Sequence, residues 1–220
     1  MHIFGVLHVY EDAEPRSAAM NMALDEALFE SASAASIRFY GWRRPSLSFG
    51  YFGFYADVAE HEAEREIVRR WTGGGIVMHG ADLTYSVVLP SCRTFKLPPS
   101  REIYTQVHDA IRRALSSQAR AALATADAPK LSEACFANPV VADVLVDGRK
   151  IAGAAQRRTR AGLLHQGSIQ YERLPAGFRE AFARELCPSA ENKTFAPELL
   201  ARARELAAEK YGTPEWLHRR

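Results

Sequence analysis

The sequence predicts a protein of mixed helix and strand, and three observations support this. Residues 20–30 repeat their apolar side chains at helical spacing. Short β-rich runs separated by glycine and proline follow, and three of them occupy 140–171. Two helical segments come last in the chain. Periodicity alone is compatible with an α/β or an α+β fold, and the order of the elements favours α+β, a mixed β-sheet flanked by helices.

The first half of the chain places one helix among short strands. In residues 20–30, Met20, Leu24 and Leu28 share one helical face, with acidic residues on the others. Pro45 and several glycines then separate runs rich in β-branched and aromatic residues. We expect strands over 1–10, 37–42, 47–54, 67–71, 76–79 and 84–89.

The second half contains a helix, a strand meander and a helical end. The helix is expected over 103–123, with His108, Arg112 and Arg113 in solvent. Asp147-Gly148 is a strong two-residue hairpin signal, and a second turn is expected at 160–162. The meander strands are predicted over 140–146, 150–157 and 163–171, and the remaining chain is predicted to be helical over 176–186 and 197–211.

Composition describes an ordinary globular chain. Its 220 residues are 47% hydrophobic and 25% charged, which fits a single catalytic domain over 1–220. The net charge of +2 is too small to indicate nucleic acid, and no apolar stretch is long enough to span a membrane. The cysteines Cys92, Cys135 and Cys187 form neither a disulfide framework nor a metal motif, so we expect a reducing cytoplasm.

The most informative segment is a run of three glycines. Gly73, Gly74 and Gly75 suit a turn where the backbone takes unusual angles or closely approaches a ligand. The basic pair Arg69-Arg70 precedes the run, and His79 follows it. A second run of small residues comes after the hairpin signal, in 148–156.

These segments resemble the lipoate–protein ligase and octanoyltransferase superfamily, whose members attach lipoyl or octanoyl groups to a lysine of a carrier domain. The matching blocks are residues 21–28, 69–86, 148–156 and 165–169, in family order. They span roughly two thirds of the chain, and several blocks in order are more specific than any single motif. The resemblance implies the biotin/lipoate protein ligase fold, which is class II synthetase-like.

The resemblance implies catalytic roles for Cys135 and Lys150. The superfamily lysine that matches Lys150 contacts the acyl carbonyl or an acyl-adenylate, whereas locally Lys150 is a surface lysine after a turn. The loop around Cys135 resembles the cysteine-dependent octanoyltransferases, in which a thiolate takes an acyl group from a thioester and passes it to an amine. The alternative is a buried, inert thiol, the role expected of Cys92 and Cys187.

Further residues are expected to bind the substrate. An acyl chain needs an apolar slot, and its carbonyl needs a donor or cation. We expect His79 and His165, which lie in the matched blocks, to line the pocket or form hydrogen bonds and not to bind a metal. One of Arg69 and Arg70 is expected to face a phosphate or an acidic carrier and the other to lie in solvent, because neighbours on a strand point to opposite faces. The predicted substrate-binding residues are Arg70, Thr72, Gly73, Gly74, Gly75, His79, Gly153, Ala155, Gln156 and His165.

Some positions depart from the octanoyltransferase pattern. Gly75 stands where that branch often has arginine, Gly80 where aspartate is common, and Ala154 where serine is common. Residues 83–86 and the short Ala134-Cys135-Phe136 element favour the transferase, as does the length of the chain.

Three functions therefore stay open, with an octanoyltransferase first. That enzyme would move an octanoyl group from acyl carrier protein to a lysine of a lipoyl domain or glycine-cleavage H protein, with no cofactor required. An ATP-dependent lipoate–protein ligase would need ATP and Mg²⁺, and a non-catalytic relative would only bind acyl groups or carriers. The basic residues around the predicted hairpin either steer an acidic carrier or protect a solvated edge, namely Arg149, Lys150, Arg157, Arg158 and Arg160.

Overall fold

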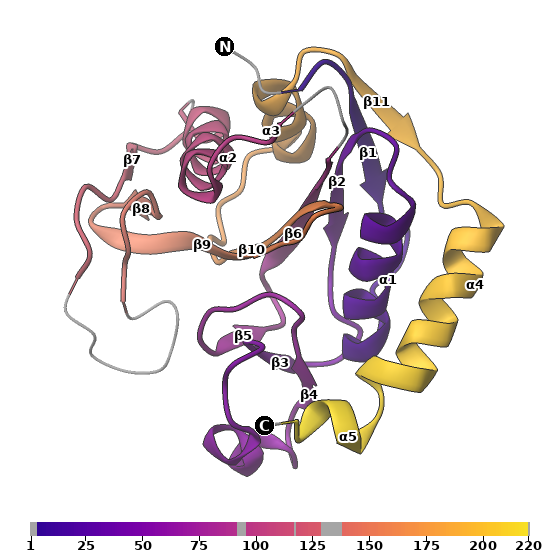
Figure 1. Ribbon diagram of the computed structural model, residues 1–220. Helices are drawn as coiled ribbons and strands as arrows, with labels where there is room; N and C mark the ends of the chain where they lie inside the picture. The colour runs from indigo at the N-terminus through magenta and orange to yellow at the C-terminus, as the bar shows by residue number, and fades with distance from the viewer. Residues whose placement is uncertain (1–3, 92–95, 117, 129–137, 220) are drawn as a thin grey trace.

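The computed structural model describes residues 4–91, 96–116, 118–128 and 138–219, and its centre is a large mixed sheet (Figure 1). The eight strands of this sheet lie in the order β11 (Ala190–Lys193), β1 (Leu7–Glu11), β2 (Ala35–Tyr40), β6 (Leu83–Pro90), β10 (Gly162–Ile169), β9 (Arg149–Arg158), β8 (Val144–Val146) and β7 (Ala121–Leu123). β1 runs parallel to both of its neighbours, and the other pairs are antiparallel. The predicted α+β class is confirmed.

A smaller three-stranded sheet lies beside the large one. Its strand order is β4 (Glu66–Arg69), β3 (Ser46–Phe49) and β5 (Val77–His79). Figure 1 shows this sheet below β9 and β10, next to α1 (Ala18–Ser31). The expected strands over 76–79 and 84–89 are therefore both present but belong to different sheets, because the chain crosses from β5 to β6 at residues 80–82.

Helices cover both faces of the large sheet. α2 (Ser100–Ala114) and α3 (Phe178–Leu186) pack on one face, and α1 packs on the other with α4 (Pro197–Leu206) outside it (Figure 1). After α4 the chain forms the π-helical turn η4 (Ala207–Tyr211) and the short α5 (Pro214–Leu217). No helix within the described residues is both long and apolar enough to cross a membrane.

β6 shows how strand alternation separates the core from the site. Every second side chain, including Leu83, Tyr85 and Val87, belongs to the apolar core under α2 and α3. The intervening Thr84 and Ser86 point to the α1 side, where both form hydrogen bonds with buried carboxylates. The face that carries polar residues on this strand is the face that borders the site.

α1 is buried almost all round because it lies between the large sheet and α4. Ser17 caps its N-terminus by accepting a hydrogen bond from the Met20 amide. Apolar side chains such as Leu24 and Leu28 pack into the two cores on this side of the sheet. Two of its buried polar residues, Asn21 and Asp25, lie four positions apart and point the same way, toward Arg38 of β2.

Several local predictions are confirmed. β8 and β9 form the hairpin expected at Asp147-Gly148, and both turn residues have positive φ, +50° and +75°. The meander of β8, β9 and β10 is present, with its second turn ending at Gly162. Cys187 is buried and its thiol donates to the Phe4 carbonyl, as expected of a structural cysteine. Cys92 lies outside the described residues.

Other predictions are wrong, each because of pairing or packing distant in sequence. The helix predicted over 103–123 ends at Ala114, and residues 121–123 pair with β8 as a strand instead. His108 is fully buried against the sheet and not solvated, although Arg112 lies at the surface as expected. The last part of the chain is not all helical, because residues 190–193 add the parallel strand β11 to β1.

Candidate functional site

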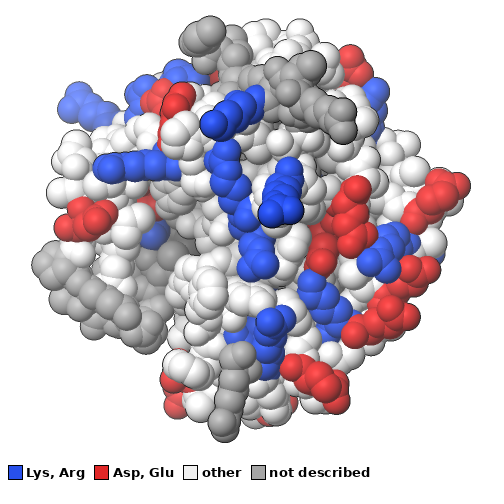
Figure 2. All heavy atoms as spheres, in the orientation of Figure 1, with Lys and Arg blue, Asp and Glu red and all other residues white. Residues whose placement is uncertain are grey.

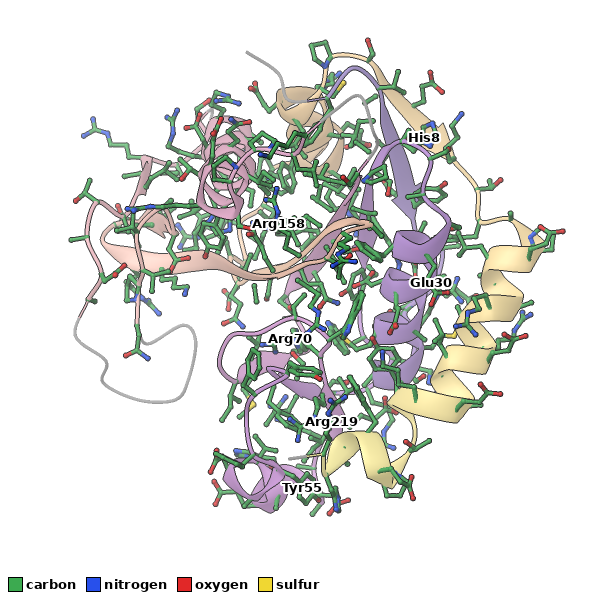
Figure 3. The ribbon with its side chains drawn as sticks, viewed as in Figure 1. His8, Glu30, Tyr55, Arg70, Arg158 and Arg219 are labelled. Atoms are coloured by element: carbon green, nitrogen blue, oxygen red, sulfur yellow. The ribbon has the colours of Figure 1, made fainter. Side chains whose placement is uncertain are left out.

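A small cavity of about 30 Å³ lies between the small sheet and the α1-side face of the large sheet. Figure 3 shows Arg70 between the two sheets, in this region. The cavity is lined by Met22, Tyr40, Trp42, Ser48, Arg70, Gly74, Val77, His79, Thr84, Gly153, Ala154, Ala155, Gln166, Gly167 and Ser168.

The walls of the cavity are mainly apolar. Met22 comes from α1, Trp42 follows β2, and Val77 comes from β5, so three separate elements contribute large side chains. β9 contributes only small residues, including Ala154 and Ala155, which leave the space open. The cavity is therefore narrow and mainly apolar, and its role in binding an acyl chain stays a prediction.

One chain of hydrogen bonds runs along the polar side of the cavity. Arg70 donates to Ser48 Oγ over 2.7 Å, and Ser48 Oγ lies 2.7 Å from His79 Nε2. His79 Nδ1 lies 2.8 Å from Asp82 Oδ2. Because a carboxylate only accepts, the proton of the neutral imidazole is on Nδ1, and Nε2 accepts from Ser48. Trp42 stacks on this imidazole at 4.0 Å between centroids.

Asp82 is the anchor of this chain. Its Oδ2 accepts from His79, from Thr84 Oγ1 at 2.8 Å and from Ser168 Oγ at 2.7 Å, while Oδ1 accepts from the Gly80 amide. Burial alone would raise the pKa of this carboxyl, but the hydrogen bonds outweigh burial and lower it to about 2. Asp82 is therefore ionised and holds three strands in register at one end of the cavity.

A buried ion pair forms the floor beneath the cavity. Asp25 of α1 accepts from Arg38 at 2.8 Å and from Gln166 Nε2 at 2.7 Å. Gln166 Oε1 in turn accepts from Thr72 Oγ1 at 2.8 Å. Thr72, the residue before the glycine turn, is thus linked through Gln166 to Asp25 of α1. Thr72 therefore supports the site without lining the cavity.

Lys150 is held in a second buried cluster, beside Gly153. Its side chain is 2% exposed, and Nζ lies 2.7 Å from Asp143 Oδ2, so it is not the surface lysine that local sequence suggests. Asp143 Oδ1 accepts from the Tyr104 hydroxyl at 2.5 Å, and that hydroxyl also accepts from the Ala154 amide at 3.2 Å. A Cβ on Gly153 would stand 2.8 Å from Nζ, so the ammonium lies directly against the cavity-lining strand.

Five of the ten predicted substrate-binding residues line the cavity. Arg70, Gly74, His79, Gly153 and Ala155 line it. Gly74 has a φ of +85°, which a glycine adopts without strain, and a Cβ added there would stand 3.1 Å from the Ala155 Cβ. The carbonyls of the two flanking glycines accept hydrogen bonds from Arg70, so this arginine organises the turn from within.

Gln156 and His165 lie behind the sheet and do not line the cavity. They point to the α2 face, where Gln156 Nε2 donates to His165 Nδ1 at 3.0 Å and His165 Nε2 lies 3.2 Å from the Tyr85 hydroxyl. Alternation along β9 and β10 explains this, because each is one residue away from a cavity-lining neighbour, Ala155 or Gln166. His79 and His165 both form hydrogen bonds, as expected.

The prediction that one arginine of the basic pair lies in solvent is wrong. Both are buried, and they point to opposite sides of β4 as alternation requires. Arg70 enters the site, whereas Arg69 donates to backbone carbonyls of the turn after β3 and of the C-terminal segment, including Tyr51 and Leu217. Arg69 therefore joins the turn after β3 to the C-terminal segment.

Comparison with known proteins identifies the family. The model of the lipoyl protein ligase A/B catalytic domain matches residues 17–204. The chain belongs to this family. An octanoyltransferase LipM of Anoxybacillus flavithermus (strain DSM 21510 / WK1) is 38% identical, over 70% of this chain and 61% of that protein. An octanoyltransferase LipM of Carboxydothermus hydrogenoformans (strain ATCC BAA-161 / DSM 6008 / Z-2901) is 33% identical, over 92% and 95%.

Solved structures agree on the fold. A lipoate-protein ligase A bound with ATP superposes with a TM-score of 0.78 at 22% identity, covering 98% of this chain and 99% of that one. A bi-partite lipoate protein ligase of Thermoplasma acidophilum, from a study that includes its E2 lipoyl domain, gives 0.72 at 23% identity, covering 99% and 97%. The implied lipoate-ligase fold is confirmed. The chain spans about three fifths of the length of the first curated relatives it matches.

The candidate site contains residues that sequence reasoning missed. Ser48, Asp82 and Asp143 have no motif of their own, since each acts through a partner brought close by the fold. Asp25 and Ser168 lay inside the matched blocks but were not singled out. Cys135 lies outside the described residues, so its role stays a prediction. Among the residues that the structure describes, no group of three or more His, Cys, Asp or Glu could hold a metal ion.

The buried histidines of this protein predict a loss of stability in mild acid. Burial lowers the pKa of His79, of His165 well below 6.5, and of His108 to about 4. Below pH 6.5 the unfolded chain therefore binds more protons than the folded one, and stability falls as pH falls toward 4. A histidine whose pKa in the folded protein lies far below 6.5, as for His108 and His165, adds a slope of up to about 1.4 kcal/mol per pH unit.

Urea unfolding at pH 7 and at pH 5 measures this effect, and proton NMR of the imidazoles identifies which histidine stays neutral. Equal free energies of unfolding at the two pH values would contradict the buried, neutral state of these histidines.

Proposed function

We propose that this protein is an octanoyltransferase that modifies a lysine of a lipoyl-domain or glycine-cleavage H protein. The observation that carries the proposal is the narrow apolar cavity with the Lys150 ammonium fixed against its small-residue wall, at Gly153. An octanoyl chain fits apolar walls, and a buried cation beside them stabilises the oxyanion that forms on the acyl carbonyl. Relatives named octanoyltransferase LipM support the same assignment.

The proposed donor is octanoyl acyl carrier protein, and the proposed nucleophile is Cys135. Cys135 loses its proton and its thiolate attacks the thioester carbonyl, a carbon–sulfur bond to Cys135 forms, the bond to the carrier sulfur breaks, and the carrier leaves as a thiol that takes up the proton from Cys135. The ε-amine of the acceptor lysine then attacks the enzyme thioester, an amide forms, and the amine proton returns to the sulfur. A thioester exchange followed by amide formation needs no ATP, so we propose that no cofactor is required.

Two alternatives make different predictions. An ATP-dependent lipoate–protein ligase would need ATP and Mg²⁺ and would keep its activity without Cys135. A non-catalytic relative would bind an acyl carrier or a lipoyl domain without transferring the acyl group.

Intact-protein mass spectrometry tests the proposal. The parent, mixed with octanoyl acyl carrier protein and no ATP, is expected to gain one octanoyl group that hydroxylamine removes. Cys135→Ala should gain none, and Cys187→Ala, which removes a buried structural thiol, should behave as the parent. Labelling of a lipoyl domain by free octanoate and ATP in all three proteins, with no enzyme adduct, would establish the ligase instead.

A further inference from the structure

A turn beside the site presents two exposed aromatic side chains. Phe52 is 80% exposed and Phe54 is 62% exposed, more than the other large apolar residues that the structure describes as exposed. Phe52 packs edge-on against Tyr51, with 5.0 Å between ring centroids. Aromatic residues so exposed on a folded surface are typical of a binding site, and a rigid support strengthens that interpretation.

Arg69 supplies the rigid support. Its guanidinium is buried against the Phe49 ring and donates to the Tyr51 carbonyl at 2.9 Å and to the Gly53 carbonyl at 2.7 Å. The same group donates to the carbonyls of Leu217 and Arg219 at 2.9 and 2.7 Å. One buried cation thus joins the exposed turn to the C-terminal segment and orders both before any partner binds.

Basic side chains lie on the same aromatic surface. Arg157 stacks on Tyr51 at 4.9 Å and on Trp71 at 5.0 Å, and Arg219 also stacks on Tyr51, 4.8 Å from the ring centroid. Within the described residues, no carboxylate forms an ion pair with either arginine. We call Tyr51, Phe52, Phe54, Arg157 and Arg219 the aromatic–basic platform.

The charge distribution agrees with this platform. In Figure 2, Lys and Arg side chains run down the middle of the face, between β9 and α5 of Figure 1, and acidic side chains gather mainly over α4 at the edge. The basic hairpin predicted from the sequence is divided between two faces, since Arg158 donates to the Leu97 carbonyl on the α2 side. Of Arg157 and Arg158, only Arg157 joins the aromatic–basic platform.

The platform lies next to the opening of the cavity. Gly74 both lines the cavity and is exposed to solvent, so the cavity opens at the glycine turn. Gly50, at the base of the aromatic turn, packs so tightly on this turn that a Cβ would stand 2.0 Å from the Gly74 carbonyl oxygen. Ala155 lies beside Gly74, since a Cβ added on Gly74 would stand 3.1 Å from the Ala155 Cβ. Arg157 lies two positions after Ala155 and therefore on the same face of β9.

We propose that the aromatic–basic platform docks the acceptor carrier domain, through carboxylates and an apolar side chain on either side of its target lysine. The proposal rests on the proposed function, because it assigns a place to the acceptor of that reaction. Arginine and aromatic residues dominate the energetics of protein interfaces. Cations at Arg157 and Arg219 attract flanking carboxylates and repel the lysine ammonium, which favours its approach to the cavity opening instead.

Binding to an unacylated lipoyl domain, measured by fluorescence anisotropy, tests the platform. The double variant Arg157→Glu with Arg219→Glu reverses the positive charge of the platform. The double variant Phe52→Ser with Phe54→Ser removes its apolar surface. The control is Arg184→Glu, an exposed arginine of α3 on the other face of the large sheet. We expect Kd to rise about tenfold or more in both platform variants, and the parent to bind more weakly in high salt. The control should match the parent.

A second readout separates docking from chemistry. Octanoyl transfer from a small-molecule thioester to hydroxylamine needs no carrier, and we expect the platform variants to keep the parental rate. Parental Kd values in both platform variants, or an equal loss in Arg184→Glu, would overturn the proposal, as would platform-dependent binding of acyl carrier protein but not of the lipoyl domain. A platform-dependent lipoyl-domain complex without any octanoyl transfer would leave docking intact and reject the proposed function.

Discussion

Replacing Asp25 with alanine is expected to lower the free energy of unfolding by about 3–5 kcal/mol. Asp25 is fully buried and accepts from the Arg38 guanidinium, the Ser86 and Tyr40 hydroxyls and the Gln166 amide. Burial lowers the pKa of Arg38, but Asp25 and Asp12 outweigh burial and raise it, and Asp12, 2.8 Å away, stays beside the guanidinium when Asp25 is removed. The cost arises because each donor is then left in the interior with fewer acceptors.

The matched control for Asp25 is another acidic residue of the same helix, Glu30. It pairs with Arg202 at the surface at 2.8 Å, so Glu30→Ala should cost less than about 1 kcal/mol. Urea unfolding of both variants measures the difference. A loss in Asp25→Ala as small as that in Glu30→Ala would show that the buried network contributes little to stability.

Replacing Lys150 with methionine is expected to lower kcat for octanoyl transfer by about a hundredfold to a thousandfold. The ammonium is the cation that lies against the cavity wall at Gly153, and methionine keeps the length of the side chain without the charge. The same change leaves Asp143 buried without its cation, so stability is expected to fall as well. Single-turnover transfer and urea unfolding are measured on the same samples.

Two further variants separate the chemical role of Lys150 from its structural one. Lys150→Met with Asp143→Asn removes both charges, so it should recover part of the lost stability but none of the activity. Gly153→Ala keeps both charges but places a Cβ 2.5 Å from Lys150 Cε, and the ammonium must move. Its kcat is expected to fall with a smaller loss of stability. Parental kcat in the doubly neutral variant would exclude Lys150 from the chemistry.

Elements with strong local signals were predicted well. The first helix, the Asp147-Gly148 hairpin and the strand meander follow from side-chain spacing and from the φ angles that turn residues allow, and these are properties of neighbouring residues. The glycine turn was also recognised, and its central glycine adopts the left-handed conformation that only glycine adopts freely. The resemblance of these sequence blocks to the superfamily then predicted the fold family and a role for Lys150.

Elements whose state depends on distant partners were predicted poorly. Residues 121–123 have alanine-rich, helix-favouring composition, yet pairing with β8 outweighs that propensity. Strand β11 is mostly exposed and polar, so nothing in its side chains indicates a strand, and only β1 beside it supplies the backbone partners. The residues around His108 have the composition of a surface helix. His108 is nevertheless buried, because α2 lies flat on the sheet.

The sequence by itself determined the family, the order of most elements, the glycine turn and the lysine of the site. Only the tertiary structure decided that Arg70 enters the cavity while Arg69 supports the aromatic turn, and that Gln156 and His165 lie behind the sheet. It also decided that Asp82, Asp25 and Asp143 are the buried anchors. The physical reason is that spacing sets which face a side chain takes, whereas burial and charge partners depend on which segments the fold brings together.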